Sequence, residues 1–358
     1  MYKMMTPGPT QVRENVRMAR SLEFQNPDLD ADFCEYYKET CLLASELLHT
    51  KNETLILDGE GILGLEAACA SITEPGDRVL VIDNGLYGES FKDFVTMYGG
   101  IPTLYTVDYD NPVDPEKLAE YLKEQHDFKY ATVVHCDTPS GMLNDISKIC
   151  PLLKSYGILT VVDSVSAMFG EEVRADDYRI DILCGGSQKA ISAPPGLTIV
   201  TISQDAKDVM NQRKTPIASF YANLKVFEHY YEEKWFPYTM PASDIYGLRQ
   251  ALENIKNDPE HLKRHEKVAE KTRTTLKEMG LTLYPHSGYS NTVTTFEVPE
   301  GFTDKEILSK MRNDYNILLA GSFGCFGGKL IRIGHMGESA NEKDVDEVLQ
   351  ALKEILGK

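Results

Sequence analysis

A carboxylate and a lysine near the middle of the chain could do covalent chemistry together. Asp163 ends an apolar, β-branched run, Ile158–Asp163, where a carboxylate without a partner would be costly. Lys189 follows the small and hydrogen-bonding residues Gly185–Gln188 and lies in an irregular segment after another such run. A lysine desolvated at such an edge can form a Schiff base, and a carboxylate opposite it would keep a pyridine nitrogen protonated. Each residue alone could be structural, but the two together indicate pyridoxal chemistry.

Short apolar runs that could position this pair recur along the first two thirds of the chain. The predicted strands are Thr54–Asp58, Arg78–Asp83, Tyr130–Cys136, Ile158–Asp163, Asp181–Cys184 and Leu197–Ile202. Continuous apolar runs that alternate with helical patterns are typical of strands buried on both faces, so we expect a mainly parallel α/β sheet. Polar residues and glycines follow these strands directly, which is where ligands bind in open α/β sheets.

The pattern changes after about residue 250. A charged helix is expected over Asp258–Met279, a strand over Thr292–Val298, a helix over Asp304–Tyr315, a short strand over Leu330–Ile333 and then a final helix. A Gly-rich turn at 321–328 precedes the short strand. This order predicts a smaller C-terminal α+β domain.

A glycine motif offers a different interpretation. Gly59–Gly64 reads G-x-G-x-x-G after a predicted strand and before a helix, and Asp83 ends the next strand. This is the dinucleotide fingerprint in its usual context, so an NAD-dependent dehydrogenase is an alternative. Glu60 weakens it, because a carboxylate at that position would face a pyrophosphate.

Composition narrows the class of protein. The 358 residues include 37 Lys or Arg and 55 Asp or Glu, for a net charge of −18, which disfavours binding to nucleic acid or to anionic membranes. No apolar run approaches the roughly 20 residues of a membrane helix, and the first ten residues do not resemble a signal peptide. The seven cysteines form no C-x-x-C pair, so we expect reduced thiols, no metal site and a cytoplasmic location.

Taken together, several strings resemble the class V aminotransferases of pyridoxal-phosphate fold type I, the group that contains alanine–glyoxylate and serine–pyruvate transaminases. These strings occur in the family's order: Thr6–Thr10, Gly59–Ala68, Asn84–Gly88, His135–Gly141, Asp163–Ser166, Ser187–Lys189 and Arg332–Gly337. The resemblance implies a transaminase that moves an amino group from a small amino donor to a 2-oxo acid such as pyruvate or glyoxylate. It also implies a large cofactor-binding domain at 13–250, a small domain at 251–358 and an N-terminal segment, 1–12, that lines the active site.

The resemblance assigns roles around the cofactor ring. Lys189 would carry pyridoxal 5′-phosphate as a covalent aldimine and move the substrate's proton. Asp163 would pair with the ring nitrogen, Val165 would pack beneath the ring, and Tyr87 would stack on its other face. Thr138 would bond the ring oxygen.

The resemblance also implies how the phosphate and the substrate are held. Gln188, the backbone of Gly61 and Ile62, and Thr239 of a second subunit would bind the phosphate, which requires a homodimer with shared active sites. Gly8 would line the substrate pocket. Arg332 would bind the substrate carboxylate as a bidentate fork.

Glu60 departs from the family pattern, which usually has a small hydroxyl residue against the phosphate. A carboxylate there should repel a phosphate by a few kcal/mol, roughly, in a partly desolvated site. Glu60 could point away, be protonated, or accompany a ligand that has no phosphate. The last account fits a further resemblance, to the pyridoxamine–pyruvate transaminases, which use unphosphorylated pyridoxamine as a substrate. Phe323 stands where that group has an arginine, which counts against it.

A further alternative is sulfur chemistry. Cysteine desulfurases share the fold and use a mobile cysteine ahead of the substrate arginine, and Cys325 precedes Arg332 by seven residues. The surrounding string does not resemble their loop, so this alternative ranks below the transaminases.

Overall fold

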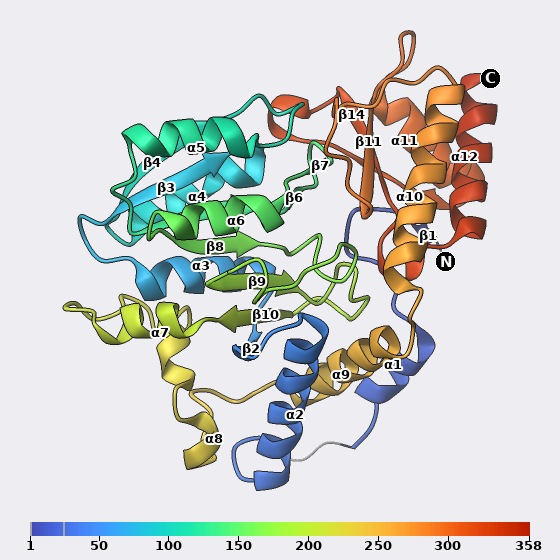
Figure 1. Ribbon diagram of the computed structural model, residues 1–358. Helices are drawn as coiled ribbons and strands as arrows, with labels where there is room; N and C mark the ends of the chain where they lie inside the picture. The colour runs from blue at the N-terminus through green and yellow to red at the C-terminus, as the bar shows by residue number, and fades with distance from the viewer. Residues whose placement is uncertain (1, 24–25) are drawn as a thin grey trace.

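The structure is a computed structural model, and it describes residues 2–23 and 26–358 (Figure 1). Residues 1, 24 and 25, which fall in the predicted N-terminal segment and large domain, lie outside the described residues. The central sheet has the order β2-β10-β9-β8-β5-β3-β4. Its strands are β2 Glu53–Asp58, β3 Arg78–Asp83, β4 Ile101–Thr106, β5 Tyr130–Val134, β8 Leu159–Asp163, β9 Ile182–Gly186 and β10 Leu197–Ile202.

The prediction of a mainly parallel sheet is confirmed. Only β10 runs against its neighbours, pairing antiparallel with β2 and β9, while β9, β8, β5, β3 and β4 pair in parallel. The strands β5, β8, β9 and β10 are buried along their whole length, as expected for continuous apolar runs. The edge strand β4 was not predicted, because it is largely exposed and contains Pro102, a residue that sheets tolerate at an edge.

One group of helices covers the central sheet, and a second group packs against the first. Those associated with it are α2 Ala31–Leu47, α3 Gly61–Ile72, α4 Leu86–Met97, α5 Pro115–Glu124, α6 Ile146–Ser155 and α7 Gln204–Asn211. The helices α1 Glu14–Arg20, α8 Tyr230–Glu233 and α9 Ala242–Lys256 pack beside them, with η1 at Leu224–Phe227. The short strands β6 Cys136–Asp137 and β7 Met142–Leu143 form a hairpin after β5.

A second, smaller sheet forms the C-terminal region, beside α10 and α12 (Figure 1). Its strands are β11 Val293–Glu297, β13 Ala320–Gly321 and β14 Leu330–Gly334. The helices here are α10 His261–Glu278, α11 Asp304–Tyr315 and α12 Glu342–Leu356, with η2 at Gly324–Phe326 and η3 at Gly337–Ser339. The α11 boundaries match the prediction, because a capping box between Thr303 and Glu306 marks its start in the sequence.

The N-terminal segment runs from this smaller region to the central sheet. β1 Lys3–Met4 pairs in parallel with β12 Ile317–Leu318, and Met5 is fully buried in the smaller core. The large core draws on residues from Val16 to Leu252. This change of core supports the predicted domain division, whose boundaries stay a prediction. None of the described helices is long and apolar enough to cross a membrane.

Candidate active site

The carboxyl ends of the central strands bring Asp163 and Lys189 together. Asp163 is the last residue of β8, only 7% exposed, and its Oδ1 accepts a hydrogen bond from Val165 N at 2.9 Å. Burial raises the pKa of Asp163 to about 6, although the Val165 hydrogen bond and the positive charge of Lys189 oppose the shift. The fold therefore holds this carboxylate in a place where its charge is poorly solvated.

Lys189 lies in the turn that follows β9, and its amine faces the N-terminal segment. The Nζ atom donates a hydrogen bond to the carbonyl oxygen of Pro7 at 2.7 Å. Burial lowers the pKa of Lys189, while the charges of Glu60 and Asp163 oppose the shift. A lysine whose ammonium form is disfavoured in this way is closer to the neutral state that a nucleophilic amine needs.

Gly8 packs directly against this lysine. A Cβ atom at Gly8 would lie 2.5 Å from Cδ and 2.7 Å from Nζ of Lys189, and the residue has a φ of +97°, which favours glycine. The sequence predicted that Gly8 lines the substrate pocket. In the structure it leaves the space that the Lys189 side chain occupies.

The loop that carries Tyr87 is held by a residue to which the sequence analysis gave no role. The buried carboxylate of Asp137 accepts hydrogen bonds from Tyr87 N at 2.9 Å and from Ser140 Oγ at 2.8 Å. A Cβ atom at Gly85 would overlap the same carboxylate. Burial raises the pKa of Asp137 to about 6. Like Asp163, Asp137 ends a buried strand, and this position in the sequence could have indicated that it has a role in the site.

Arg332 reaches the site from β14 of the smaller sheet. Its Nε and Nη2 atoms donate to the carbonyl oxygen of Gly321 at 2.9 and 2.7 Å, and its guanidinium carbon lies 5.6 Å from the centre of the Phe323 ring. Burial lowers the pKa of Arg332, and the nearby Tyr87 and Asp137 oppose this shift. The rings of Tyr87 and Phe323 are 6.1 Å apart. An arginine and two aromatic rings therefore meet at one place.

The remaining ring-side residues lie close to this group. Thr138 is buried and follows Asp137, and its hydroxyl opposes the rise that burial causes in the pKa of Tyr87. A Cβ atom at Gly61 would lie 2.9 Å from a methyl carbon of Val165, so the absence of a side chain there keeps the first turn of α3 close to Val165. The missing side chain therefore lets α3 begin directly against Val165, the residue expected beneath the ring.

The N-terminus of α3 is already paired with an anion from the chain itself. Glu60 caps this helix: its Oε2 accepts a hydrogen bond from Ile62 N at 2.9 Å, and its Oε1 accepts one from Nε2 of Gln188. Gln188 is buried, and its Oε1 has no hydrogen-bond partner within the described parts of the chain. Helix N-termini bind anions through their free N–H groups and dipole, so Glu60 sits where a phosphate would be expected.

Thr239 does not belong to this group of contacts within the chain. It is exposed and donates a hydrogen bond to Asp28 at 2.8 Å. The neighbouring Tyr238 stacks on Tyr221, with ring centres 4.3 Å apart, and Tyr221 donates to Asp58 at 2.8 Å. This segment therefore reaches the end of β2, two residues before Glu60. The role of Thr239 across a subunit interface stays a prediction.

The residues fit the ring of a pyridoxal cofactor better than its phosphate. The ring end offers a buried carboxylate, Asp163, and the Lys189 amine, each of which has one hydrogen bond to a backbone group. The phosphate end offers Ile62 N and the Gln188 amide, but both already donate to Glu60. A bound phosphate would have to displace or neutralise that carboxylate.

Comparisons with known proteins identify the class to which this site belongs. The family model for aminotransferase class-V matches residues 17–346, so the chain belongs to the class V aminotransferases, whose cofactor is pyridoxal phosphate. Among its relatives is an uncharacterized aminotransferase of Methanocaldococcus jannaschii, 36% identical over 98% of this chain and 93% of the relative. A pyridoxamine–pyruvate transaminase of Mesorhizobium japonicum is 34% identical over 94% of this chain and 86% of that protein.

Solved structures agree with the family match. The ureidoglycine–glyoxylate aminotransferase of Bacillus subtilis superposes with a TM-score of 0.95, at 30% identity, over 99% of this chain and 93% of that one. The fold is therefore that of the fold type I pyridoxal-phosphate aminotransferases.

The family match and the named transaminases among the relatives favour a transaminase over the two other enzyme interpretations. The family match replaces the dinucleotide interpretation, and the two carboxylate oxygens of Asp83 accept from Tyr109 at 2.7 Å and Thr106 at 3.0 Å, which leaves them poorly placed for a ribose. Cys325 is exposed and lines a cavity of about 670 Å³, which neither Lys189 nor Arg332 lines in the described chain.

Proposed function

We propose that this aminotransferase moves an amino group from a small amino donor to a 2-oxo acid such as pyruvate or glyoxylate. The observation that carries the proposal is the arrangement of Asp163, at the end of β8, and Lys189, in the turn after the neighbouring strand β9, whose Nζ donates to Pro7 O at 2.7 Å. Arg332 reaches the same region from β14. The named activities of a pyridoxamine–pyruvate and a ureidoglycine–glyoxylate transaminase among the relatives support these acceptors.

Lys189, Asp163 and Thr138 would act on the cofactor, and Arg332 would act on the substrate. Bound pyridoxal phosphate supplies an electron sink for the bond that breaks at the substrate α-carbon. Lys189 would hold the cofactor, and its amine would accept and return the proton of the substrate α-carbon. Asp163 would keep a proton on the ring nitrogen, and Thr138 would bond the ring oxygen. Arg332 binds the substrate carboxylate, because its planar fork matches the two oxygens.

The phosphate and the second subunit complete the proposal. Gly61, Ile62 and Gln188 would bind the phosphate together with Thr239 of a second subunit, so we expect a homodimer. Val165 and Tyr87 would enclose the ring. A cytoplasmic location is part of the same proposal, and the seven free cysteines, six of them buried, support a reducing compartment.

One spectrum and one substrate series test the main proposal. Purified protein should show a borohydride-sensitive absorbance band, and amino acids should bleach it in a half-reaction that pyruvate or glyoxylate reverses. Arg332→Lys should raise KM for amino acids by about 10- to 100-fold, because the bidentate contact is worth about 1–3 kcal/mol. A protein without the band, or a band that no amino acid changes, would contradict the proposal.

A second candidate function rests on Glu60. Its carboxylate takes the two donors that a phosphate would need, which favours a ligand that has no phosphate. The enzyme would then be a pyridoxamine–pyruvate transaminase that uses unphosphorylated pyridoxal or pyridoxamine as a substrate. The 34% identity to an enzyme of that name supports this candidate, whereas Phe323, which stacks near Arg332 in place of an arginine, counts against it.

Titration separates the two candidates. Apoprotein is titrated with pyridoxal and with pyridoxal phosphate in parallel, and the borohydride-sensitive band is followed. Tighter binding of pyridoxal phosphate supports the main proposal and requires Glu60 to leave the helix N-terminus or to be protonated. Tighter binding of pyridoxal, with pyridoxamine and pyruvate as working substrates, supports the second candidate.

A further inference from the structure

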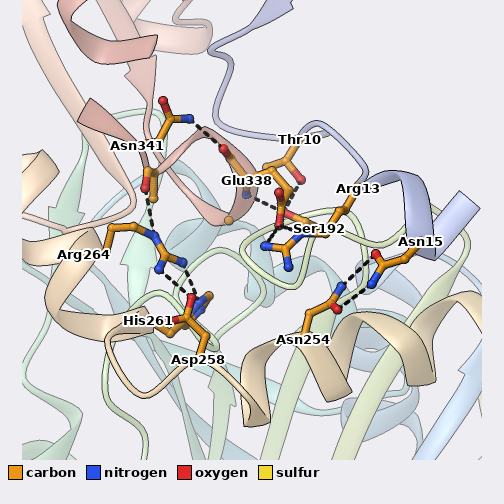
Figure 2. Close-up of polar contacts among 12 residues, drawn as sticks. Thr10, Arg13, Asn15, Ser192, Asn254, Asp258, His261, Arg264, Glu338 and Asn341 are labelled. Carbon is orange, nitrogen blue, oxygen red and sulfur yellow. Dashed lines mark hydrogen bonds and ion pairs between the residues drawn. The ribbon is translucent and has the colours of Figure 1, made fainter. Parts of the chain in front are cut away.

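A polar cluster behind the site joins three segments that are far apart in the sequence (Figure 2). Thr10 and Arg13 come from the stretch of chain that leads into α1, Ser192 from the turn that holds Lys189, and Glu338 from the segment that follows β14. Neither Ser192 nor Glu338 belongs to the ring end or the phosphate end. The cluster therefore connects the part of the chain that carries Lys189 to the part that carries Arg332.

Ser192 is the centre of the cluster on the lysine side. Its backbone N–H donates to the carbonyl oxygen of Lys189 at 2.9 Å, and it holds a left-handed φ of 58°, which is uncommon for serine. Its Oγ lies 3.2 Å from Oγ1 of Thr10 and accepts from Glu338 N at 2.9 Å. Thr10 in turn donates from Oγ1 to the Lys189 carbonyl at 3.1 Å and from N to that of Gln188 at 3.0 Å.

Glu338 anchors the other side. Oε1 of its carboxylate receives both Nε of Arg13, at 3.0 Å, and Nη2, at 2.8 Å, so a single carboxylate oxygen is held by two donors of the guanidinium. Asn341 donates to its carbonyl at 2.9 Å (Figure 2). The preceding Gly337 has a φ of +57°, and a Cβ atom there would overlap Ser192 Oγ, so the two segments approach as closely as their backbones allow.

We propose that Ser192 and Glu338 are positioning residues that set the spacing between the Lys189 amine and the Arg332 guanidinium. This spacing would select amino donors that carry a carboxylate on the same carbon as the amine. The inference rests on the proposed roles of Lys189 and Arg332. A substrate held at both ends is sensitive to the distance between them, and displacements of about 1 Å cost up to 10²-fold in rate. A substrate held only at the amine does not report that distance.

Half-reactions with two kinds of donor test the inference in the loaded enzyme. Wild type, Ser192→Ala and Glu338→Gln are compared with L-alanine and with a simple alkylamine that has no carboxylate, and the bleaching of the absorbance band is measured. For each variant, kcat/KM for alanine should fall about tenfold while the rate with the amine stays within about twofold. Binding of propionate, which reports on Arg332 alone, should stay unchanged. The variants would alter the distance between Lys189 and Arg332 but leave the Arg332 guanidinium itself intact.

A nearby pair supplies the matched control. Asn15 and Asn254 exchange two hydrogen bonds, at 2.8 and 3.2 Å, and join α1 to α9 without contacting Ser192 or Glu338 (Figure 2). Asn254→Ala should lower stability slightly and leave the ratio of the two donors unchanged. Ser192→Gly relieves the left-handed backbone while removing the same hydroxyl, so it should fold well and show the same altered ratio as Ser192→Ala.

The outcomes separate this inference from the proposed function. Failure of wild type to react with alanine would contradict the proposed function. With wild type active, equal losses for both donors in the Ser192 and Glu338 variants would mean a merely structural role and would overturn the inference. An unchanged ratio in these variants would overturn it as well.

Discussion

The two ends of the cofactor site are built in opposite ways. At the ring end, Asp163 accepts one hydrogen bond from backbone and the Lys189 amine donates one to a carbonyl, so two ionisable groups are kept with few partners. At the N-terminus of α3, the exposed carboxylate of Glu60 accepts from both Ile62 N and Gln188. One end is left unsatisfied for a ligand, while the other end is satisfied by the chain itself.

This difference shows where binding energy and discrimination arise. A buried charge with too few partners destabilises the free protein, and a ligand that supplies the missing partner recovers that free energy. We therefore expect the ring end to favour a ligand with a protonated ring nitrogen and an aldehyde. A second anion would be repelled at the N-terminus of α3, so we expect this end to distinguish a phosphorylated ligand from an unphosphorylated one.

The largest expected effect comes from removing the amine at the ring end. Lys189→Ala should lower turnover by about 10³-fold or more, because both the covalent attachment and the proton carrier are lost. The borohydride-sensitive band should disappear, while circular dichroism and the midpoint of thermal unfolding stay close to wild type. Lys207→Ala, which removes only a surface ion pair to Glu53, is the control and should leave turnover unchanged.

Neutralising Asp163 should separate function from stability. Asp163→Asn should lower turnover by about 10²-fold, because the ring nitrogen loses its stabilising charge. At pH 7 the apoprotein should become more stable, by at most about 3 kcal/mol, because the variant no longer buries a carboxylate whose pKa is raised from 3.8 to about 6.

The pH dependence gives the sign of that effect. Because the folded-state pKa of Asp163 lies above its unfolded value, ionisation costs the folded state, and stability contributed by the neutral form is lost as the pH rises from 3.8 through about 6. The stability difference between Asp163→Asn and wild type should thus be small near pH 4 and reach its full size above pH 6. A stability difference that is constant with pH would show that burial does not raise the pKa of Asp163.

Replacing Glu60 should change the preference between ligands more than the rate. Glu60→Ser should raise affinity for pyridoxal phosphate relative to pyridoxal by about tenfold or more, since a like charge within a few Å is worth about 1–4 kcal/mol. Glu60→Gln keeps the size and an acceptor for Ile62 N, so it isolates the charge. The relative affinity is measured by titration of the apoprotein. If it is unchanged in both variants, the Glu60 carboxylate does not disfavour a phosphate, and the proposed difference between the two ends is wrong.

The smallest effect is expected at Gly8. Gly8→Ala places a side chain at a φ of +97° and against Lys189, which should lower stability by about 1–2 kcal/mol and turnover several-fold. Preference between pyridoxal and its phosphate should not change, because Gly8 contacts only the ring end. A shift of that preference, measured in the same titration, would mean that the two ends are coupled.

Local patterns predicted most of the elements. The strands Arg78–Asp83 and Leu197–Ile202 and the helix Asp304–Tyr315 have the predicted bounds, because continuous apolar runs and a capping box mark them directly in the sequence. The edge strand Ile101–Thr106 was missed because its exposure gives it no apolar run. Asp137 was missed as a support of the Tyr87 loop, because Tyr87 lies 50 positions away from it along the chain.

The sequence by itself determined the class of enzyme, since the order of its strings and the Asp163–Lys189 pair depend on residue types at fixed positions. It could state that Glu60 is unusual, but not where its carboxylate goes. Only the tertiary structure decided that Glu60 binds Gln188, 128 positions away, and that Ser192 meets Glu338 across 146 positions. The reason is physical: such contacts depend on how separate elements pack, and hydrophobic patterns fix which residues are buried without fixing which polar groups then meet.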